Sequence, residues 1–450
     1  MKTTWKLTLP LIVVSSMVLT ACGGGSSSSS DNNTGGTGGG EGTSTVTLTA
    51  SVVQSTVCNT EVPASSAELV VYDNNWVIKS RHKADVNGNI SATIAQTNNV
   101  NISFIGTSGT GANRQLEVVT YAQHPVGDLG IYAIPGTATQ GCECVVTDIT
   151  MTTDLGSLDY NVQLAGANSP SLMSRITPNT VAFDNVSICR ETGSSWPTLY
   201  GASNSHYDGA FAGSLTGYNP NQPLMIVLDQ SPTTRSALVP QDSLYANVTH
   251  QLPNGQLTTS MQSPYNEMPL FEQLSDVEVV TLRGGEVRTE YIDGLTVRLG
   301  RSQRHSVALP FSETLEVTLP SSDIQQQLFS MLQQLIESDS TDYDLTAVSE
   351  LDTFHLDVTF NLTDGSRYSQ YFFGPKKASI PDEALPADYG VDALIDDSNL
   401  DLSVSMLGYG SQQSYQQYQA SRIRASKQPS NQRLINDRSK FSQVYIQLSQ

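Results

Sequence analysis

The cysteines are the residues whose chemistry the sequence constrains most. Cys22 lies near the N-terminus, and the others are Cys58, Cys142, Cys144 and Cys189. Cys142 and Cys144 lie two residues apart, so in an extended segment their side chains share one face and a bond between them is strained. We therefore expect Cys58 to pair with one of them and Cys189 with the other. The alternative is a zinc site of four thiolates, although zinc sites usually space their cysteines as C-x2-C.

The histidines show no motif of a known catalytic or metal site. None lies in an H-E-x-x-H pattern or at zinc spacing from the cysteines. His206 with Asp208, and His355 with Asp357, each place a carboxylate two residues from an imidazole. On a strand both groups share one face, which suits a metal or an oriented base, but exposed strand positions are also commonly polar. The sequence has no G-x-S-x-G motif, which marks the nucleophile of one class of hydrolases. A pair of catalytic carboxylates, as in glycosidases, has no sequence motif by which it is recognised.

Carboxylates gather between residues 382 and 401, and the segment 396–401 is the best candidate for calcium. Calcium prefers several oxygen ligands, which this segment offers, but the glycine and the terminal glutamate of an EF-hand loop are absent. Asp396, Asp397 and Asp401 are therefore weak calcium candidates. We predict no other metal and no cofactor.

The first residues have the pattern of an export signal. Lys2 and Lys6 precede the apolar stretch 7–20, which is too short to span a bilayer stably. The segment 19–22 then reads Leu-Thr-Ala-Cys, which resembles the lipobox of bacterial lipoproteins. The resemblance implies cleavage before Cys22 and lipidation of that cysteine. No aspartate follows Cys22, and this implies transport to the outer membrane.

The lipobox has two consequences for the rest of the chain. Residues 22–44 are rich in Gly and Ser, with no apolar residue after the cysteine, so we expect a disordered tether. Export also places the remaining cysteines in an oxidising compartment, which favours disulfides over zinc.

The formal net charge of −20 opposes binding to phosphate backbones, so we exclude nucleic acid as a partner.

Short alternating strands dominate the body of the sequence. Ala67–Tyr72 is followed by a polar turn, a short strand, and the Asp85-x-x-Gly88 turn. This order resembles the carboxypeptidase regulatory-like and transthyretin-like β-sandwich domains, and implies a spacer or binding module. Residues 107–114 are Gly-rich, but they lead into a strand without the Lys of a P-loop, so they predict a hairpin loop.

The later sequence predicts an antiparallel sheet with one helix. Gly284-Gly285 and Asp293-Gly294 are typical of hairpin turns. Apolar residues at helical spacing predict a helix over 322–337, with its apolar stripe in the core. The basic, Gln/Ser-rich tail from 411 predicts little order before a last strand near Phe441.

One aromatic-rich stretch allows two interpretations. Residues 193–218 combine Gly, Ser and Asn with five aromatic side chains. Such a loop is able to bind a sugar or peptide, because aromatics stack and amides bond hydroxyls. The alternative, which we favour, is a turn-rich connection that packs its own aromatics.

These observations predict a mainly β, multi-domain envelope lipoprotein. The predicted parts are a signal peptide (1–21), a lipidated tether (22–44), a β-sandwich (45–144), a second β region (145–270), an antiparallel sheet domain with a helix (271–410) and a basic tail (411–450). The leading function is non-catalytic binding or a structural role at the outer membrane. The partners would be the membrane, through the lipid, and a protein or glycan ligand. A polysaccharide or peptide hydrolase and an assembly factor are the alternatives.

Overall fold

The computed structural model describes most of the chain beyond the predicted tether. The described residues are 44–158, 161–168, 173–205, 209–253, 255–260, 267–274, 277, 279–292, 295–338, 341–381, 386–391, 394, 400–410, 414–428 and 440–449. Within these ranges the protein is mainly β, as the sequence predicts, with two α-helices. Cys22, Asp396 and Asp397 lie outside the described residues, as does the pair of His206 and Asp208.

The first part of the body is the expected β-sandwich. Its core joins Leu48 and Leu129 of one layer to Leu69 and Phe104 of the other, and all four are buried. Alternating apolar residues explain the layers, because every second side chain of a strand faces the same side. One layer is β1 (Thr45–Thr56), β2 (Glu61–Pro63), β5 (Asn89–Ala95) and β8 (Asp128–Ala138), and the other is β3 (Ala67–Tyr72), β4 (Ile78–Lys83), β6 (Asn99–Ser108) and β7 (Gln115–Pro125).

The second layer of the sandwich continues into a twelve-stranded sheet. Strand β7 pairs in parallel with β25, from Gln115 opposite Arg367 to Tyr121 opposite Phe373. The sheet order is β18-β17-β20-β21-β28-β27-β24-β25-β7-β6-β3-β4, so one hydrogen-bonded ladder crosses the domain boundaries drawn from the sequence. Its later members are β17 (Tyr245–Leu252), β18 (Gly255–Ser260), β20 (Val279–Ile292), β21 (Leu295–Ala308), β24 (Thr353–Asn361), β25 (Arg367–Gly374), β27 (Leu400–Gly408) and β28 (Lys440–Ser449).

Helix α2 (Asp323–Ser338) covers the middle of this sheet and matches the helix expected over 322–337. Its residues Ile324, Leu328 and Leu335 are buried in the same cluster as Phe354 and Phe372 of the sheet. The stripe therefore belongs to the core, as expected. Two short strands lie in the same region and pair with each other, β23 (Asp342–Asp344) and β26 (Lys377–Ser379).

The part between β8 and β17 forms a second sandwich. Sheet β11-β12-β9-β15 packs through Ile149 and Val181 on Leu199 and Phe211 of sheet β10-β13-β14. The bounds are β9 (Cys142–Thr152), β10 (Val162–Ala165), β11 (Met173–Thr177), β12 (Thr180–Glu191), β13 (Leu199–Ser205), β14 (Gly209–Leu215) and β15 (Leu224–Val227). A small sheet of β16 (Thr233–Leu238), β19 (Glu267–Leu270) and β22 (Leu315–Glu316) follows.

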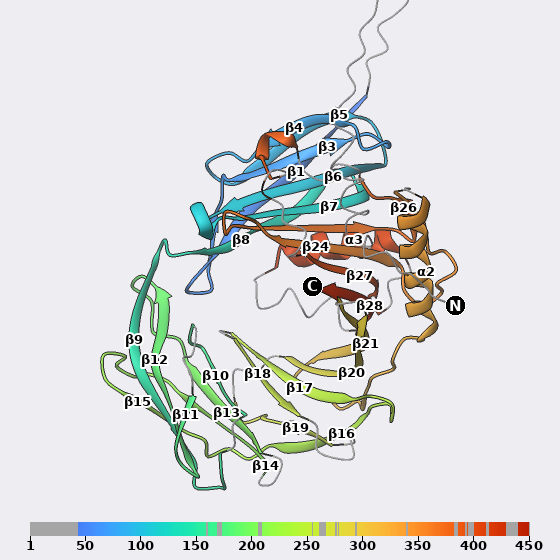
Figure 1. Cartoon of the computed structure of the whole chain (residues 1–450). Helices are drawn as coiled ribbons and strands as arrows, with labels where there is room; N and C mark the ends of the chain where they lie inside the picture. The colour runs from blue at the N-terminus through green and yellow to red at the C-terminus, as the bar shows by residue number, and fades with distance from the viewer. Residues whose placement is uncertain are drawn as a thin grey trace, which may run out of the picture.

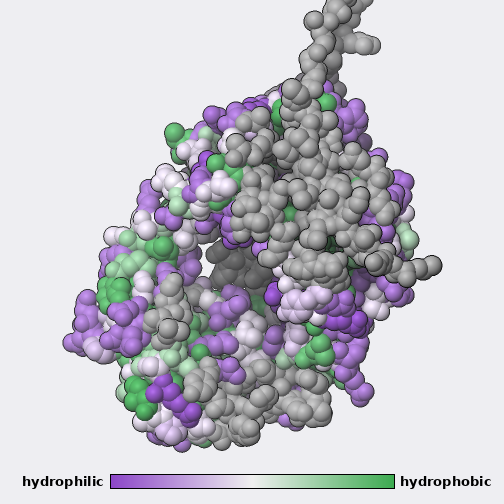
Figure 2. Space-filling view, viewed as in Figure 1, coloured by the Kyte–Doolittle hydropathy of each residue, from purple (hydrophilic) through white to green (hydrophobic). Residues whose placement is uncertain are grey.

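These parts close into a ring, which Figure 1 shows with β9 descending on one side and β20 and β21 on the other. The second sandwich meets the far end of the twelve-stranded sheet at β10 and β18, where the Gln163 side chain and the Thr258 backbone exchange two hydrogen bonds of 2.7 Å. The space-filling view in Figure 2 is hollowed at its centre, between the first sandwich and the second.

Two sequence predictions are corrected by the structure. Gly284 and Gly285 lie inside β20 and make no hairpin turn. A Cβ on Gly285 would lie 2.4 Å from the Tyr245 hydroxyl, so glycine serves close packing here. The tail also carries a helix, α3 (Tyr415–Ser426), before the expected last strand β28. Ser414 caps α3 by accepting a hydrogen bond from the amide of Gln417.

The structure contains two disulfides, and Cys58 and Cys189 each pair with one of the two neighbouring cysteines, as expected. Cys58 is bonded to Cys142, which joins the end of β1 to the start of β9, and the bond closes 84 residues of sequence. Cys144 is bonded to Cys189, which lies directly opposite it on β12. The first disulfide therefore fastens the second sandwich to the first at the point where the chain crosses between them.

We predict that replacing Cys58 and Cys142 by alanine lowers the melting temperature by about 10 °C. Closing a loop of this length restricts the unfolded chain and contributes about 4–5 kcal/mol. Differential scanning fluorimetry of the double variant measures the shift. The pair Cys144→Ala and Cys189→Ala, which opens a 45-residue loop, should give a slightly smaller one. An unchanged melting temperature in the first variant would contradict the stabilising role.

Candidate binding site

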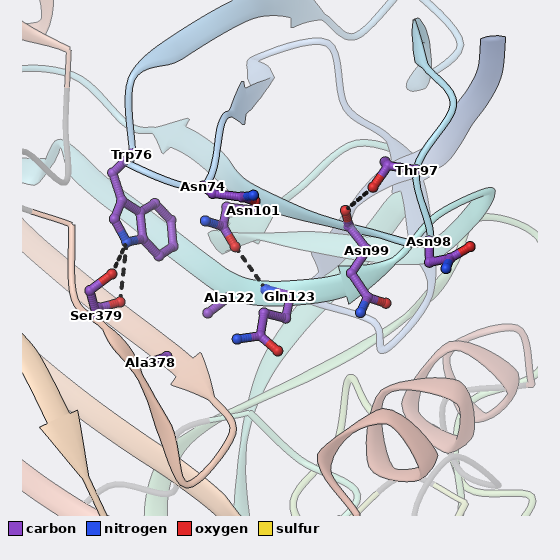
Figure 3. Close-up of a pocket in the computed structure, with 10 residues that line it drawn as sticks. All are labelled: Asn74, Trp76, Thr97, Asn98, Asn99, Asn101, Ala122, Gln123, Ala378 and Ser379. Atoms are coloured by element: carbon purple, nitrogen blue, oxygen red, sulfur yellow. Dashed lines mark hydrogen bonds between the residues drawn. The ribbon is translucent and has the colours of Figure 1, made fainter. Parts of the chain in front are cut away.

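A pocket of about 440 Å³ lies at the edge of the first sandwich, where the β3–β4 turn approaches β26. Figure 3 shows Trp76 and Ser379 at one end, Thr97 to Asn99 at the other, and Asn101 and Gln123 between them. Most of the lining residues are polar, and none is charged. The lining consists of Asn74, Trp76, Thr97, Asn98, Asn99, Asn101, Ala122, Gln123, Ala378 and Ser379.

The β3–β4 turn that carries Trp76 is held by the side chain of Asp73. One oxygen of that carboxylate accepts hydrogen bonds from the amides of Asn75 (2.9 Å) and Val77 (3.0 Å), and the other contacts Lys79. Lys79 and these bonds hold the pKa of Asp73 below its usual range. This is the polar turn that the sequence predicts at residues 73–75, and its tight geometry gives Trp76 a φ of +61°.

Trp76 connects this turn to the C-terminal half of the protein. Its indole Nε1 donates to the carbonyl (3.2 Å) and hydroxyl (3.0 Å) oxygens of Ser379. The ring also meets Tyr72 edge-on and Phe372 at a tilt, with centroids 5.4 and 6.0 Å apart. These contacts fix the indole, while part of it stays exposed at the pocket.

Asn101 joins the turn to the opposite wall of the pocket. It is buried, its side-chain nitrogen donates to the carbonyl of Asp73 (3.2 Å), and its oxygen accepts from the amide of Gln123 (2.8 Å). Gln123 lies at a bulge, where the β6–β7 register shifts between Val100 and Ile102, and has a φ of +51°. A bulge redirects a side chain out of the regular alternation, and the Gln123 side chain is exposed at the pocket.

Two residues other than glycine therefore have left-handed backbones at one pocket. Trp76 and Gln123 each carry a Cβ in this conformation, which costs about 1–3 kcal/mol. Strain of this kind clusters at functional sites, because the surrounding structure must hold it in place. The Asp73 turn and the Asn101 bonds supply that support. The hydrogen bonds around the pocket thus hold its strained residues in place, and this pocket is the candidate binding site.

Sequence reasoning did not find this pocket. Its residues come from the β3–β4 turn, the β5–β6 turn, the bulge of β7 and strand β26, and only the folded sheet brings them together. The one sequence signal is the density of Asn in 97–101 and 74–75 beside a tryptophan.

The aromatic stretch 193–218 is mostly a β-hairpin of β13 and β14. Tyr200 and Phe211 are buried, Tyr218 donates its hydroxyl hydrogen to the carbonyl of Pro197 (2.8 Å), and Trp196 stacks on Arg190. These four described aromatics thus pack within the protein, which agrees with the interpretation that we favoured.

The pair His355 and Asp357 lies on one face of β24, as its spacing predicts. His355 is packed against Tyr371 and Phe373, and burial lowers its pKa to about 4. Burial also raises the pKa of Asp357 to about 6 and that of Glu117, on β7, above its usual value. Glu117 accepts a hydrogen bond from the Tyr132 hydroxyl (3.2 Å) and lines a second pocket of about 380 Å³ below α3.

The described residues include no group of three or more His, Cys, Asp or Glu placed to hold a metal. Of the calcium candidates, only Asp401 is described, exposed on β27 opposite Thr359 of β24. The calcium hypothesis for Asp396, Asp397 and Asp401 stays a prediction. In the described part of the chain, no helix is long and apolar enough to cross a membrane.

Comparison with known proteins gives little further information. No family model matches the chain, and no curated protein matches it. Among solved structures, the chain is similar to a variant of BcpA, the major pilin subunit of Bacillus cereus, at 8% identity. The match covers 63% of this chain and 97% of the pilin chain, with a TM-score of 0.13. A TM-score this low does not indicate a shared fold.

We predict that Asp357→Asn stabilises the protein at neutral pH. The pKa of Asp357 is raised in the folded state, so this group destabilises the fold as the pH rises from about 4 through 6. Asparagine removes the buried charge and still accepts the hydrogen bond from Thr359. The gain should be on the order of 2 kcal/mol at pH 7 and vanish near pH 4.

Denaturant unfolding of both proteins at the two pH values measures this difference. Asp364→Asn is the contrasting control, because hydrogen bonds from Ser366 lower the pKa of Asp364, so this variant should gain nothing at pH 7. An Asp357→Asn variant that is equally stable or weaker at pH 7 would show that the carboxylate is not destabilising.

Proposed function

We propose that this protein is an outer-membrane lipoprotein with a non-catalytic binding role, and that the amide-lined pocket around Asn101 is its ligand site. The observation that carries the binding role is the pocket itself. Its side chains are neutral hydrogen-bonding groups, one indole and two alanine methyl groups, and hydrogen bonds of the surrounding residues hold two left-handed backbones in place. Such a set orients a ligand through hydrogen bonds and shape.

The membrane anchor rests on the sequence. The lipobox-like segment before Cys22, followed by glycine, supports lipidation and transport to the outer membrane. Two or three acyl chains on one cysteine give stable attachment, at about 0.8 kcal/mol for each buried methylene. The first described strand, β1, begins at Thr45, directly after the predicted tether, so the sandwich that carries the pocket is the part of the body joined to the anchor.

A second candidate is an envelope polysaccharide hydrolase, and Glu117 with Asp357 favours it. The charge of Asp357 contributes to the raised pKa of Glu117, and Glu117 lines a pocket beside Tyr121 and Tyr371. Carboxyl groups with raised pKa values serve as general acids in glycosidases. Hydrolysis of a polysaccharide by the wild type, lost in Glu117→Gln with the fold intact, would replace the binding proposal by this one.

Lipidation is tested by replacing the predicted acceptor. Cells grown with radiolabelled palmitate should label the wild-type chain and leave Cys22→Ser unlabelled, with the variant absent from the outer-membrane fraction. Cys58→Ser, which removes a cysteine of the body, should remain labelled. Label on Cys22→Ser, or an unchanged distribution between membranes, would refute the anchor. Protease treatment of intact cells then determines which face of the membrane carries the body.

A further inference from the structure

We propose that the amide-lined pocket binds a neutral glycan, with Trp76 and the side-chain amides as its contacts. This inference rests on the binding role proposed above and names the ligand class. Three properties of the pocket favour such a ligand: the kind of hydrogen-bonding groups, the partly exposed indole, and the absence of charge.

The hydrogen-bonding groups match hydroxyl groups. Each asparagine or glutamine side chain offers an acceptor oxygen and two donor hydrogens, and a hydroxyl group needs both kinds of partner. Asn74, Asn98, Asn99 and Gln123 have exposed side chains in the pocket. None of these four makes a side-chain hydrogen bond within the described structure. In contrast, both the amide nitrogen and the amide oxygen of buried Asn101 form hydrogen bonds. Four amides around the pocket are thus available to a ligand.

The indole of Trp76 supplies the apolar part of the site. A sugar ring presents hydroxyl groups at its rim and C–H groups on its faces, so it needs an apolar surface as well as polar partners. Trp76 is partly exposed, and its Nε1 is already bonded to Ser379, so the ring is fixed and only its surface remains for contact. A rigid aromatic side chain loses little entropy when a ligand binds.

Charge favours a neutral glycan over an acidic one. None of the pocket's lining residues is charged, and the nearby carboxylate of Asp73 is occupied by Lys79 and two backbone amides. The chain as a whole carries a formal charge of −20, which repels polyanions. A uronate or sulfated sugar would meet this field with no cation in the pocket to oppose it.

The strained backbone at Gln123 gives a variant that separates binding from folding. The Gln123 side chain is exposed and its φ of +51° suits glycine, so Gln123→Gly should keep or slightly raise the melting temperature. The same change removes one amide from the pocket. If the Gln123 side chain has no part in binding, its removal will leave the ligand affinity unchanged.

The experiment is isothermal titration calorimetry on the full lipidated chain in a zwitterionic detergent, since a sugar-headed detergent would compete. The probes are maltotriose and chitotriose as neutral glycans, trigalacturonate as an acidic one, and an uncharged Ser/Asn peptide. We expect at least one neutral trisaccharide to bind, with trigalacturonate and the peptide weaker by tenfold or more.

Substitutions of pocket residues test whether that binding takes place in the pocket. Asn99→Ala and Gln123→Gly should each weaken it about tenfold, the loss of roughly one hydrogen bond left unmade, and Trp76→Ala should weaken it more. Asn113→Ala, an exposed amide on the β6–β7 loop, and Trp196→Ala, a tryptophan of the second sandwich, are the matched controls and should bind as wild type.

Three results would overturn the inference: no neutral trisaccharide bound up to about 10 mM, affinity unchanged in Gln123→Gly and Asn99→Ala, or preferred binding of trigalacturonate or the peptide. These outcomes are independent of the membrane anchor, because titration does not depend on where the protein resides in the cell. Peptide binding that the pocket variants weaken would keep the proposed binding role and reject the glycan. Labelling of Cys22, conversely, tests the anchor whatever the ligand.

Discussion

The parallel pairing of β7 with β25 is the contact on which the rest of the molecule depends. It joins residues 115–121 to residues 367–373, which are far apart in sequence, through a continuous backbone ladder. Parallel strands require a long crossover between them, and here the crossover contains the whole second sandwich and the β20–β21 hairpin. Because of this pairing, one layer of the first sandwich becomes the end of a twelve-stranded sheet, and the chain closes into a ring.

The amide-lined pocket depends on the same pairing. Trp76 comes from the N-terminal sandwich and Ser379 from the strand that follows β25, so their hydrogen bonds exist only when β25 lies in register beside β7. The loops of the pocket are then fixed on a scaffold of buried strands. Such an arrangement keeps polar groups in place without using their own hydrogen bonds, which leaves Asn98, Asn99 and Gln123 open to a partner.

The sequence predicts the features that neighbouring residues determine, and it misses those that residues far apart in the chain form together. Alternating apolar and polar residues predict the strands, and apolar residues at helical spacing predict α2. The spacing of Cys142 and Cys144 predicts that they belong to separate disulfides. Helix α3 was missed because its buried residues include Gln419 and Ser421, so it shows no apolar stripe. Gly284-Gly285 was interpreted as a turn because Tyr245, which needs the space beside Gly285, comes from another strand. The pocket was missed because four separated segments form it.

The disulfides also decide what happens to the chain after a cut. Cys58–Cys142 and Cys144–Cys189 enclose two adjacent loops that together cover nearly all of residues 58–189. A single break of the backbone within either loop leaves both pieces covalently attached to each other. The β3–β4 turn at Asn74 and the β5–β6 turn at Asn98 are exposed, and both lie inside the first loop. A protein nicked by a protease at either of these turns would therefore stay one molecule, with its remaining strands still paired, until its disulfides were reduced.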